Sequence, residues 1–229
     1  MALTLCVLIS IVVHSIIFIK ENTMIYILDY DAGNLTSVKR ACDYLGLKAK
    51  ITSDWKEVEK AGHIIFPGVG NASQAMATLK ERYLDRALAA AFQKGTPILG
   101  ICVGAQIILS FSEEENTKGL DLIPGKCIRF NLSNRDLKIP HMGWNRVKLK
   151  KDHFILKDFK NETQMYFVHS YYPLPDDPEN IYAECEYEIS FPVVIGRKNL
   201  VASQFHLEKS GRHGLDILKK FCEWDGKQC

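Results

Sequence analysis

Between residues 24 and 101, short apolar runs rich in β-branched residues alternate with stretches of helical periodicity. The runs at 25–29, 48–52, 63–66 and 97–101 have the composition of strands. Strands that alternate with helices in this way are typical of a parallel sheet covered by helices on both faces. The chain is therefore predicted to adopt an α/β fold.

Three helices are predicted between these strands. Asn34 caps the first, which Gly46 ends, and Ser53 caps a short second helix that runs to Val58. The third is a single longer helix that ends at Gly95. Its apolar stripe consists of Met76, Leu79, Tyr83, Leu88 and Phe92.

After residue 119 the pattern changes to short extended runs separated by Pro, Gly, Asn and Asp. These runs, at 126–130, 146–150, 165–172, 181–188, 191–198 and 200–206, predict added mixed or antiparallel strands. A last helix is predicted over 212–224. Since no repeat or linker interrupts the pattern, we expect one domain over 24–229.

The first 23 residues are mostly apolar and form a separate N-terminal extension, 1–23. As a helix, the run 3–19 would be about 26 Å long, against a hydrocarbon core of about 30 Å. Polar residues interrupt it, and no basic n-region or cleavage site precedes Lys20. We interpret it as a mis-assigned start or a disordered extension in preference to a membrane anchor, with Met24 as an alternative start.

The composition argues against polyanionic partners and against a metal cage. The 229 residues carry a formal charge of +2 with acidic and basic residues interspersed, so neither nucleic acid nor an anionic membrane is an expected partner. Seven cysteines occur without a CxxC pair, which favours reduced thiols in the cytoplasm and no metal site.

The segment GICVG, at 100–104, places a cysteine between two glycines where a strand meets a helix. This spacing is typical of a nucleophile elbow, in which a strained turn presents the central side chain at the end of a sheet. The helix N-terminus favours thiolate at Cys102. The alternative is a buried, inert cysteine.

Two further segments fit the same chemistry. In an extended SQFHLEKS segment, His206 and Glu208 share a side about 6 to 7 Å apart at Cα, which suits a Cys-His-Glu triad. The loop PGVG, at 67–70, follows a strand. It predicts an oxyanion hole made by amides near Val69 or Gly70 and at Val103, or alternatively a plain turn or a phosphate loop.

From Met24 to about Gly226 the sequence resembles the class I, triad-type glutamine amidotransferases, most closely the glutaminase subunits of imidazole glycerol phosphate synthase. The motifs that carry the resemblance are ILDYDAGN, FPGVGNASQAM, PILGICVGAQ, GLDLIPGK, IPHMGWN, YFVHSYY and SQFHLEKS, in that order. The resemblance implies a flavodoxin-like domain with Cys102 as nucleophile, His206 as general base and acid, and Glu208 as its partner.

The resemblance also implies substrate and partner residues. The positions that hold L-glutamine are Gly70, Gln106, His169, Ser170 and Tyr171. The face toward a (β/α)8 synthase subunit comprises Asn34, Pro140, His141, Met142, Gly143, Trp144, Asn145 and Lys209. Three positions depart from the family pattern: Asp31 stands where Gly is usual, Ala105 where Met is usual, and Leu207 where Pro is usual.

The implied reaction is hydrolysis of glutamine to glutamate and ammonia, with ammonia passed to the cyclase subunit of a heterodimer for imidazole ring formation in histidine biosynthesis. No cofactor is expected. Three alternatives stay open at this point: a paralogue that supplies ammonia for amidination of a surface sugar, a stand-alone γ-glutamyl thiol hydrolase, and an inactive binding subunit.

Overall fold

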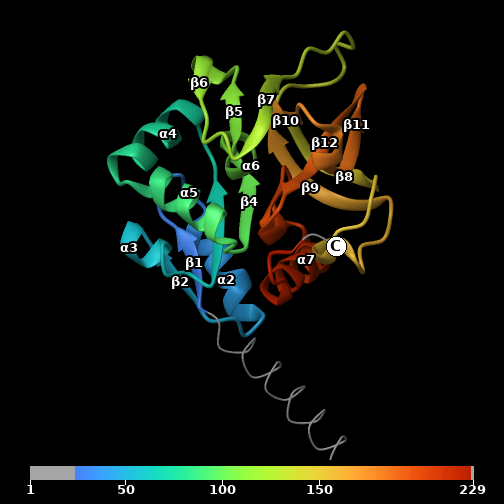
Figure 1. The fold of residues 1–229 in the computed structure, drawn as a ribbon. Coiled ribbons are helices and arrows are strands. Elements are labelled where there is room, and N and C mark those ends of the chain that lie inside the picture. Colours follow the sequence, from blue (N-terminus) through green and yellow to red (C-terminus); the bar gives the residue numbers. More distant parts are fainter. Residues whose placement is uncertain (1–23, 228–229) are drawn as a thin grey trace, which may run out of the picture.

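The computed structural model describes residues 24–227, so the predicted extension 1–23 lies outside the described residues (Figure 1). Within 24–227, a nine-stranded sheet has the order β2-β1-β3-β4-β13-β12-β11-β8-β9. Its first five strands in this order are parallel to one another: β2 Ala49–Thr52, β1 Ile25–Leu28, β3 His63–Gly68, β4 Ile98–Cys102 and β13 Leu200–Ser203. The predicted parallel α/β core is confirmed for the four strands within 25–102, and β13, predicted among the added mixed or antiparallel strands, joins it as a fifth.

The remaining strands of this sheet are antiparallel, as predicted for the second half of the chain. They are β12 Ile189–Arg197, β11 Ile181–Tyr187, β8 His141–Leu149 and β9 Thr163–His169. A second sheet of four strands, within the same described range, has the order β10-β7-β5-β6. It comprises β10 Tyr171–Pro175, β7 Ile123–Arg129, β5 Leu109–Ser112 and β6 Thr117–Lys118.

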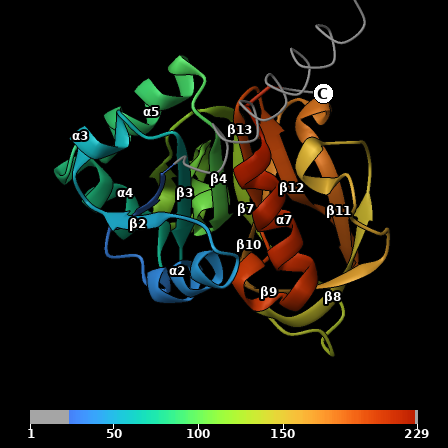
Figure 2. The same ribbon diagram turned by 90° about the horizontal axis from the view of Figure 1, so that it is seen from below.

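Helices cover both faces of the parallel strands. The α-helices are α2 Leu35–Tyr44, α3 Trp55–Val58, α4 Ala72–Glu81, α5 Leu84–Lys94, α6 Val103–Ile107 and α7 Gly211–Glu223. Short 3₁₀ turns occur at η1 Glu114–Asn116, η2 Phe154–Leu156, η3 Pro178–Asn180 and η4 Leu207–Lys209. Figure 2 shows α5 and α2 on opposite sides of the parallel strands. Within 24–227, no helix has the length and apolar character that crossing a membrane requires.

The predicted single helix ending at Gly95 is wrong, because Tyr83 adopts a left-handed conformation, φ 59°, between α4 and α5. Leu79 and Leu84 are both fully buried. On one continuous helix, residues five apart are separated by about 140° and cannot share a face, so the break lets both reach the core. Tyr83, predicted on the apolar stripe, is instead 54% exposed.

Two other local predictions fail. Asp54, not Ser53, caps α3, since its carboxylate accepts the Lys56 N–H at 2.9 Å. The run 165–172 is not one strand, because the chain passes from β9 to β10, and so from one sheet to the other, around Ser170. Neither change affects the order of the parallel strands.

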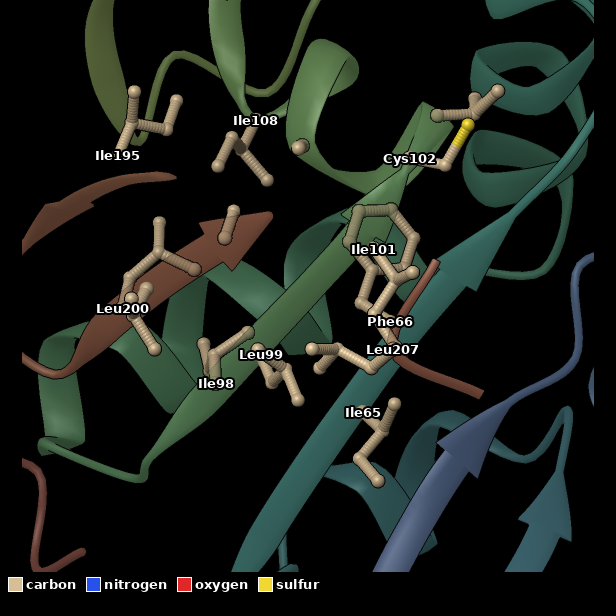
Figure 3. Close-up of a cluster of buried hydrophobic side chains, with 14 of the residues drawn as sticks. Ile65, Phe66, Ile98, Leu99, Ile101, Cys102, Ile108, Ile195, Leu200 and Leu207 are labelled. Carbon is tan, nitrogen blue, oxygen red and sulfur yellow. The ribbon is translucent and has the colours of Figure 1, made fainter. Parts of the chain in front are cut away.

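The core lies along β3 and β4, in which every residue is buried. Figure 3 shows Ile98, Leu99 and Ile101 following β4, with Cys102 at its end. The next helix, α6, lies so close to β3 that a Cβ on Gly104 would be 2.0 Å from the carbonyl oxygen of Phe66. Gly104 is therefore needed for the packing of α6 against the sheet.

This close approach predicts that Gly104→Ala lowers the free energy of unfolding by about 2 kcal/mol or more, because the Phe66 backbone has to move. The matched control is Gly46→Ala, at a left-handed position, φ +70°, with open space around the added methyl group. That change costs only the backbone strain, about 1 kcal/mol. Urea unfolding of both variants measures the difference. Equal losses would mean that α6 does not pack this tightly.

Candidate active site

Cys102 lies at the turn between β4 and α6, with φ 54° and ψ −106°. A non-glycine residue with positive φ is strained, and this is the conformation predicted for the elbow. A Cβ on Gly100 would be 2.9 Å from the Cβ of Ala202, so the glycine before the cysteine lets β13 approach β4. The predicted elbow is confirmed. It brings the sulfur to the carboxyl end of the parallel strands.

His206 reaches the same edge because β13 pairs in parallel with β4, Ser203 opposite Ile101. The prediction that 200–206 is one strand is wrong, since β13 ends at Ser203 and a 3₁₀ turn follows His206. The turn nevertheless brings the ring Nδ1 of His206 to 2.7 Å from Oε1 of Glu208. Leu207, between them, is buried in the core, and both polar side chains are only 1% exposed.

The charges around His206 favour its protonated form. Burial lowers the pKa of His206, but its interactions with Cys102 and Glu208 outweigh burial and raise the pKa to about 9. Within the described residues, Nε2 of the ring has no hydrogen bond. With Nδ1 held by Glu208, this second nitrogen is free to exchange a proton.

A cavity of about 260 Å³ opens beside the sulfur. Its lining includes every residue predicted to hold substrate or to form the oxyanion hole. The full set is Val69, Gly70, Cys102, Val103, Gln106, Glu114, Pro140, Val168, His169, Ser170 and Tyr171. The volume is just below the range of about 300–1,000 Å³ that is usual for small-molecule sites, which suits a molecule the size of an amino acid.

Three residues of the site were missed. Glu114 lies within the run EEE, whose repetition gives no reason to select one carboxylate. Gln204 donates from Nε2 toward the Cys102 sulfur at 3.8 Å, and the alternation used for His206 would have placed Gln204 on the same side. The carbonyl of Val168 lies 3.9 Å from the same sulfur. No sequence signal marked Val168.

The predicted oxyanion donors differ in availability. The N–H of Val69 donates to the carbonyl of Ala32 at 2.7 Å, so this donor is engaged outside the cavity. Val103 begins α6, where an N–H has no acceptor within the helix. Gly70 lines the cavity with φ +105°. In this conformation Val69 is therefore not an oxyanion donor, because the loop after β1 holds its amide.

Asn34 holds the N-cap position predicted for it, but its side chain has a different partner. It precedes α2 in a left-handed conformation, φ 61°, and its side chain makes no cap bond. The side-chain amide instead donates to Oε1 of Glu208, the oxygen that also bonds His206. The predicted cap role is therefore wrong, because the amide binds Glu208 and so connects the loop after β1 with this carboxylate.

The predicted partner face divides between exposed and buried residues because side chains alternate along β8. Met142 and Trp144 are 63% and 53% exposed. The Lys209 ammonium lies over the Tyr166 ring, which Trp144 also contacts. His141 is 3% exposed, so its predicted place on the face is wrong. Pro140 lines the cavity, and the Asn145 amide points inward to His141.

Within residues 24–227, no group of three or more His, Cys, Asp or Glu side chains is arranged to hold a metal ion.

Comparisons with known proteins agree on one family. The model of the family described as Glutamine amidotransferase class-I matches residues 26–224. The "Imidazole glycerol phosphate synthase subunit HisH" of Maridesulfovibrio salexigens is 50% identical over 206 residues, covering 88% of this chain and 97% of that protein. The subunit of the same name from Moorella thermoacetica is 43% identical over 87% of this chain and 94% of its own length.

Among solved structures, the "Structure of PurLQS from Thermotoga maritima" superposes with a TM-score of 0.71 at 16% identity, over 88% of this chain and 98% of that one. At this identity the similarity shows the fold alone.

The site predicts selective labelling of Cys102 by iodoacetamide at pH 7.5. Burial raises the pKa of Cys42 and Cys185 to about 12 and raises those of Cys127 and Cys222 as well. Cys102 lines the cavity beside His206, so among the cysteines within 24–227 it should react first. His206→Gln should slow the reaction roughly tenfold by removing the cationic partner. Peptide mass spectrometry over time measures both, and earlier labelling of Cys42 would contradict this description of the site.

Proposed function

This chain belongs to the class-I glutamine amidotransferases and, within them, to the HisH subunits of imidazole glycerol phosphate synthase, and we propose that Cys102, His206 and Glu208 perform its glutaminase reaction. The observation that carries the proposal is the meeting of these residues at one sheet edge. Cys102 lies on the strained elbow beside the cavity, and Glu208 holds Nδ1 of His206 at 2.7 Å.

The reaction proceeds in two steps. The Cys102 thiolate attacks the side-chain amide carbon of glutamine, and the protonated His206 transfers its Nε2 proton to the departing nitrogen as the carbon–nitrogen bond breaks. Ammonia leaves and a thioester remains. His206, now neutral, removes a proton from water, which attacks the thioester; glutamate leaves as the sulfur recovers its electron pair. These steps need no metal or organic cofactor.

Polar groups of the cavity account for binding of glutamine. The carboxylate of Glu114 lines the cavity, held in place because it accepts the Ala72 N–H at 2.7 Å. A carboxylate there suits the α-ammonium group of an amino acid. The segment 169–171 also lines the cavity and supplies backbone groups. Gly70 and Val103 line the cavity together with Cys102, and their amides act as the oxyanion donors in this mechanism.

The partner is the (β/α)8 cyclase subunit, which docks on the face formed by Met142, Trp144 and Lys209 and receives the ammonia for imidazole ring closure, the lyase step of the complex. Exposed Met and Trp are the side chains expected at the centre of an interface. The heterodimer works in the cytoplasm, where thiols such as the five free cysteines within 24–227 stay reduced.

The alternatives have less support. The relatives at 43% and 50% identity are HisH subunits, which disfavours a role in sugar amidination or as a stand-alone hydrolase. The hydrogen bond that engages the Val69 amide also disfavours a stand-alone hydrolase. Since Ala32 holds this donor, we expect hydrolysis by the isolated subunit to be slow and to rise when the partner moves the loop after β1.

Removal of the sulfur tests the nucleophile. In a complex with a cyclase subunit from a HisH-containing synthase, Cys102→Ala should lower glutamate release by about 1,000-fold or more, because the thioester cannot form. Cys127→Ala, at a fully buried cysteine of β7, is the control and should retain activity. Unchanged glutamate release by the Cys102 variant would end the proposed mechanism.

Truncation of one exposed ring tests the docking face. Trp144→Ala should weaken binding of the cyclase subunit by about tenfold or more, as expected for an aromatic residue at the centre of an interface. Tyr44→Ala removes a ring that is 80% exposed at the end of α2 and should change the Kd by less than about twofold. Isothermal titration measures both. A larger effect at Tyr44 would place the interface elsewhere.

A further inference from the structure

Two buried histidines lie between the exposed residues of β8 and the cavity. His141 begins β8 and His169 ends β9, and the two are paired across these strands. They are 3% and 5% exposed. Nδ1 of His141 lies 2.9 Å from Nε2 of His169. The catalytic steps described above use neither ring.

The acceptors around these rings fix where each proton lies. Nδ1 of His169 is 2.8 Å from the carbonyl oxygen of Tyr171, which can only accept, so this nitrogen carries a hydrogen. Burial lowers the pKa of His169 to about 3 and that of His141 to about 4, so both rings are neutral. Nε2 of His169 is then an acceptor, and Nδ1 of His141 donates to it.

Asn145 completes the sequence of donors. Nε2 of His141 is left as an acceptor, and the amide nitrogen of Asn145 lies 3.2 Å from it. The same nitrogen also donates to the carbonyl of Glu186 at 2.9 Å, while the amide oxygen accepts the N–H of Arg146 at 2.7 Å. Every hydrogen bond in this series therefore runs in one direction, from Asn145 to Tyr171.

At its other end the series reaches the catalytic sulfur. The Tyr171 carbonyl also accepts the side-chain amide of Gln106 at 2.9 Å. The same Gln106 nitrogen lies 3.1 Å from Oε1 of Gln204, whose own amide points at Cys102. The orientation of one peptide group, at the start of β10, therefore sets the positions of Gln106, which lines the cavity, and of Gln204, which contacts the sulfur.

Aromatic rings pack against His141 on several sides. The centroid of Tyr187 lies 4.2 Å from that of His141, and the centroid of Phe167 lies 4.9 Å away. Phe130 and Phe191 contact the same ring. In such surroundings a ring nitrogen that loses its partner cannot replace it, so the direction of the series is strongly favoured.

We propose that His141 is a positioning residue for glutamine binding: Asn145, His141 and His169 form a relay of hydrogen bonds that holds the Tyr171 carbonyl against Gln106 and so shapes the substrate-binding wall. The relay begins at Asn145 on β8, the strand that also carries the exposed Met142 and Trp144. Three side chains therefore connect this strand to the cavity wall. The inference rests on the proposed glutaminase function.

A matched set of variants tests the relay in the complex with the cyclase subunit. The amide nitrogen of Asn can occupy the place of imidazole Nδ1, so His141→Asn keeps the donor to His169. Gln places its amide where Nε2 was, and Phe has no donor. We expect His141→Gln and His141→Phe to raise the KM for glutamine about tenfold, the equivalent of one lost hydrogen bond, with kcat within about twofold. His141→Asn should keep the KM within about threefold of the original.

The control is His153→Phe, at a histidine that is equally buried, 3% exposed, and whose Nδ1 accepts the Ile155 N–H outside the relay. It should leave the KM unchanged even if it lowers the melting temperature. Equal KM values for the Asn and Phe variants of His141 would overturn the proposal, and so would a rise in KM for His153→Phe as large as that for His141→Phe.

A second measurement needs neither activity nor a variant. Long-range ¹H–¹⁵N NMR spectra of the original chain at pH 7 should show both His141 and His169 as neutral rings protonated at Nδ1. An Nε2-protonated or doubly protonated ring at either position would overturn the relay. Because this result does not depend on turnover, failure of the relay is distinguishable from failure of the glutaminase mechanism, which the Cys102→Ala variant tests.

Discussion

The site depends on the strained turn at Cys102, where β4 ends and α6 begins. The backbone strain of a cysteine at positive φ costs about 1–3 kcal/mol, which the surrounding structure has to offset. The parallel pairing of β4 with β3 and β13 offsets it, together with the contact of Gly104 with the Phe66 backbone. Because these parallel strands end at one edge, the sulfur meets the loop after β3 and the imidazole after β13 there.

Features that depend on local sequence signals could be predicted from the sequence. Features that depend on packing between distant segments were missed. The four parallel strands within 25–102 and the elbow at Cys102 follow from short apolar runs and two glycines, and these were predicted correctly, whereas β13 was not predicted to join the parallel strands. The break at Tyr83 was missed because it depends on burying Leu79 and Leu84 together. The burial of His141 was missed because its position on the β8 register depends on pairing with β9, which residue types alone do not show.

The loop after β1 holds two parts of the site at once. Ala32 accepts the Val69 amide, and Asn34 donates to Glu208. Asp31, at φ 61°, pairs with Arg82, which also donates to the Asp29 carbonyl at 3.1 Å. The carboxylate of Asp31 is 60% exposed, and exposed pairs contribute little. The loop is therefore held by the Asp29–Thr52 and Ala32–Val69 backbone hydrogen bonds, by the buried Tyr30 hydroxyl on the Pro67 carbonyl, and by the weak exposed pair of Asp31 with Arg82.

In the proposed mechanism, the proposed docking face is connected to the catalytic residues by two segments, one rigid and one more easily rearranged. The relay through His141 consists of neutral, buried hydrogen bonds whose protons have one arrangement, so it resists change and keeps the glutamine wall constant. The loop after β1 is partly exposed and can exchange the Ala32–Val69 bond for another at small cost. A partner that contacts both regions can then alter the oxyanion donors without altering the substrate wall. The proposal therefore assigns the binding of glutamine and the rate of its hydrolysis to separate parts of one fold.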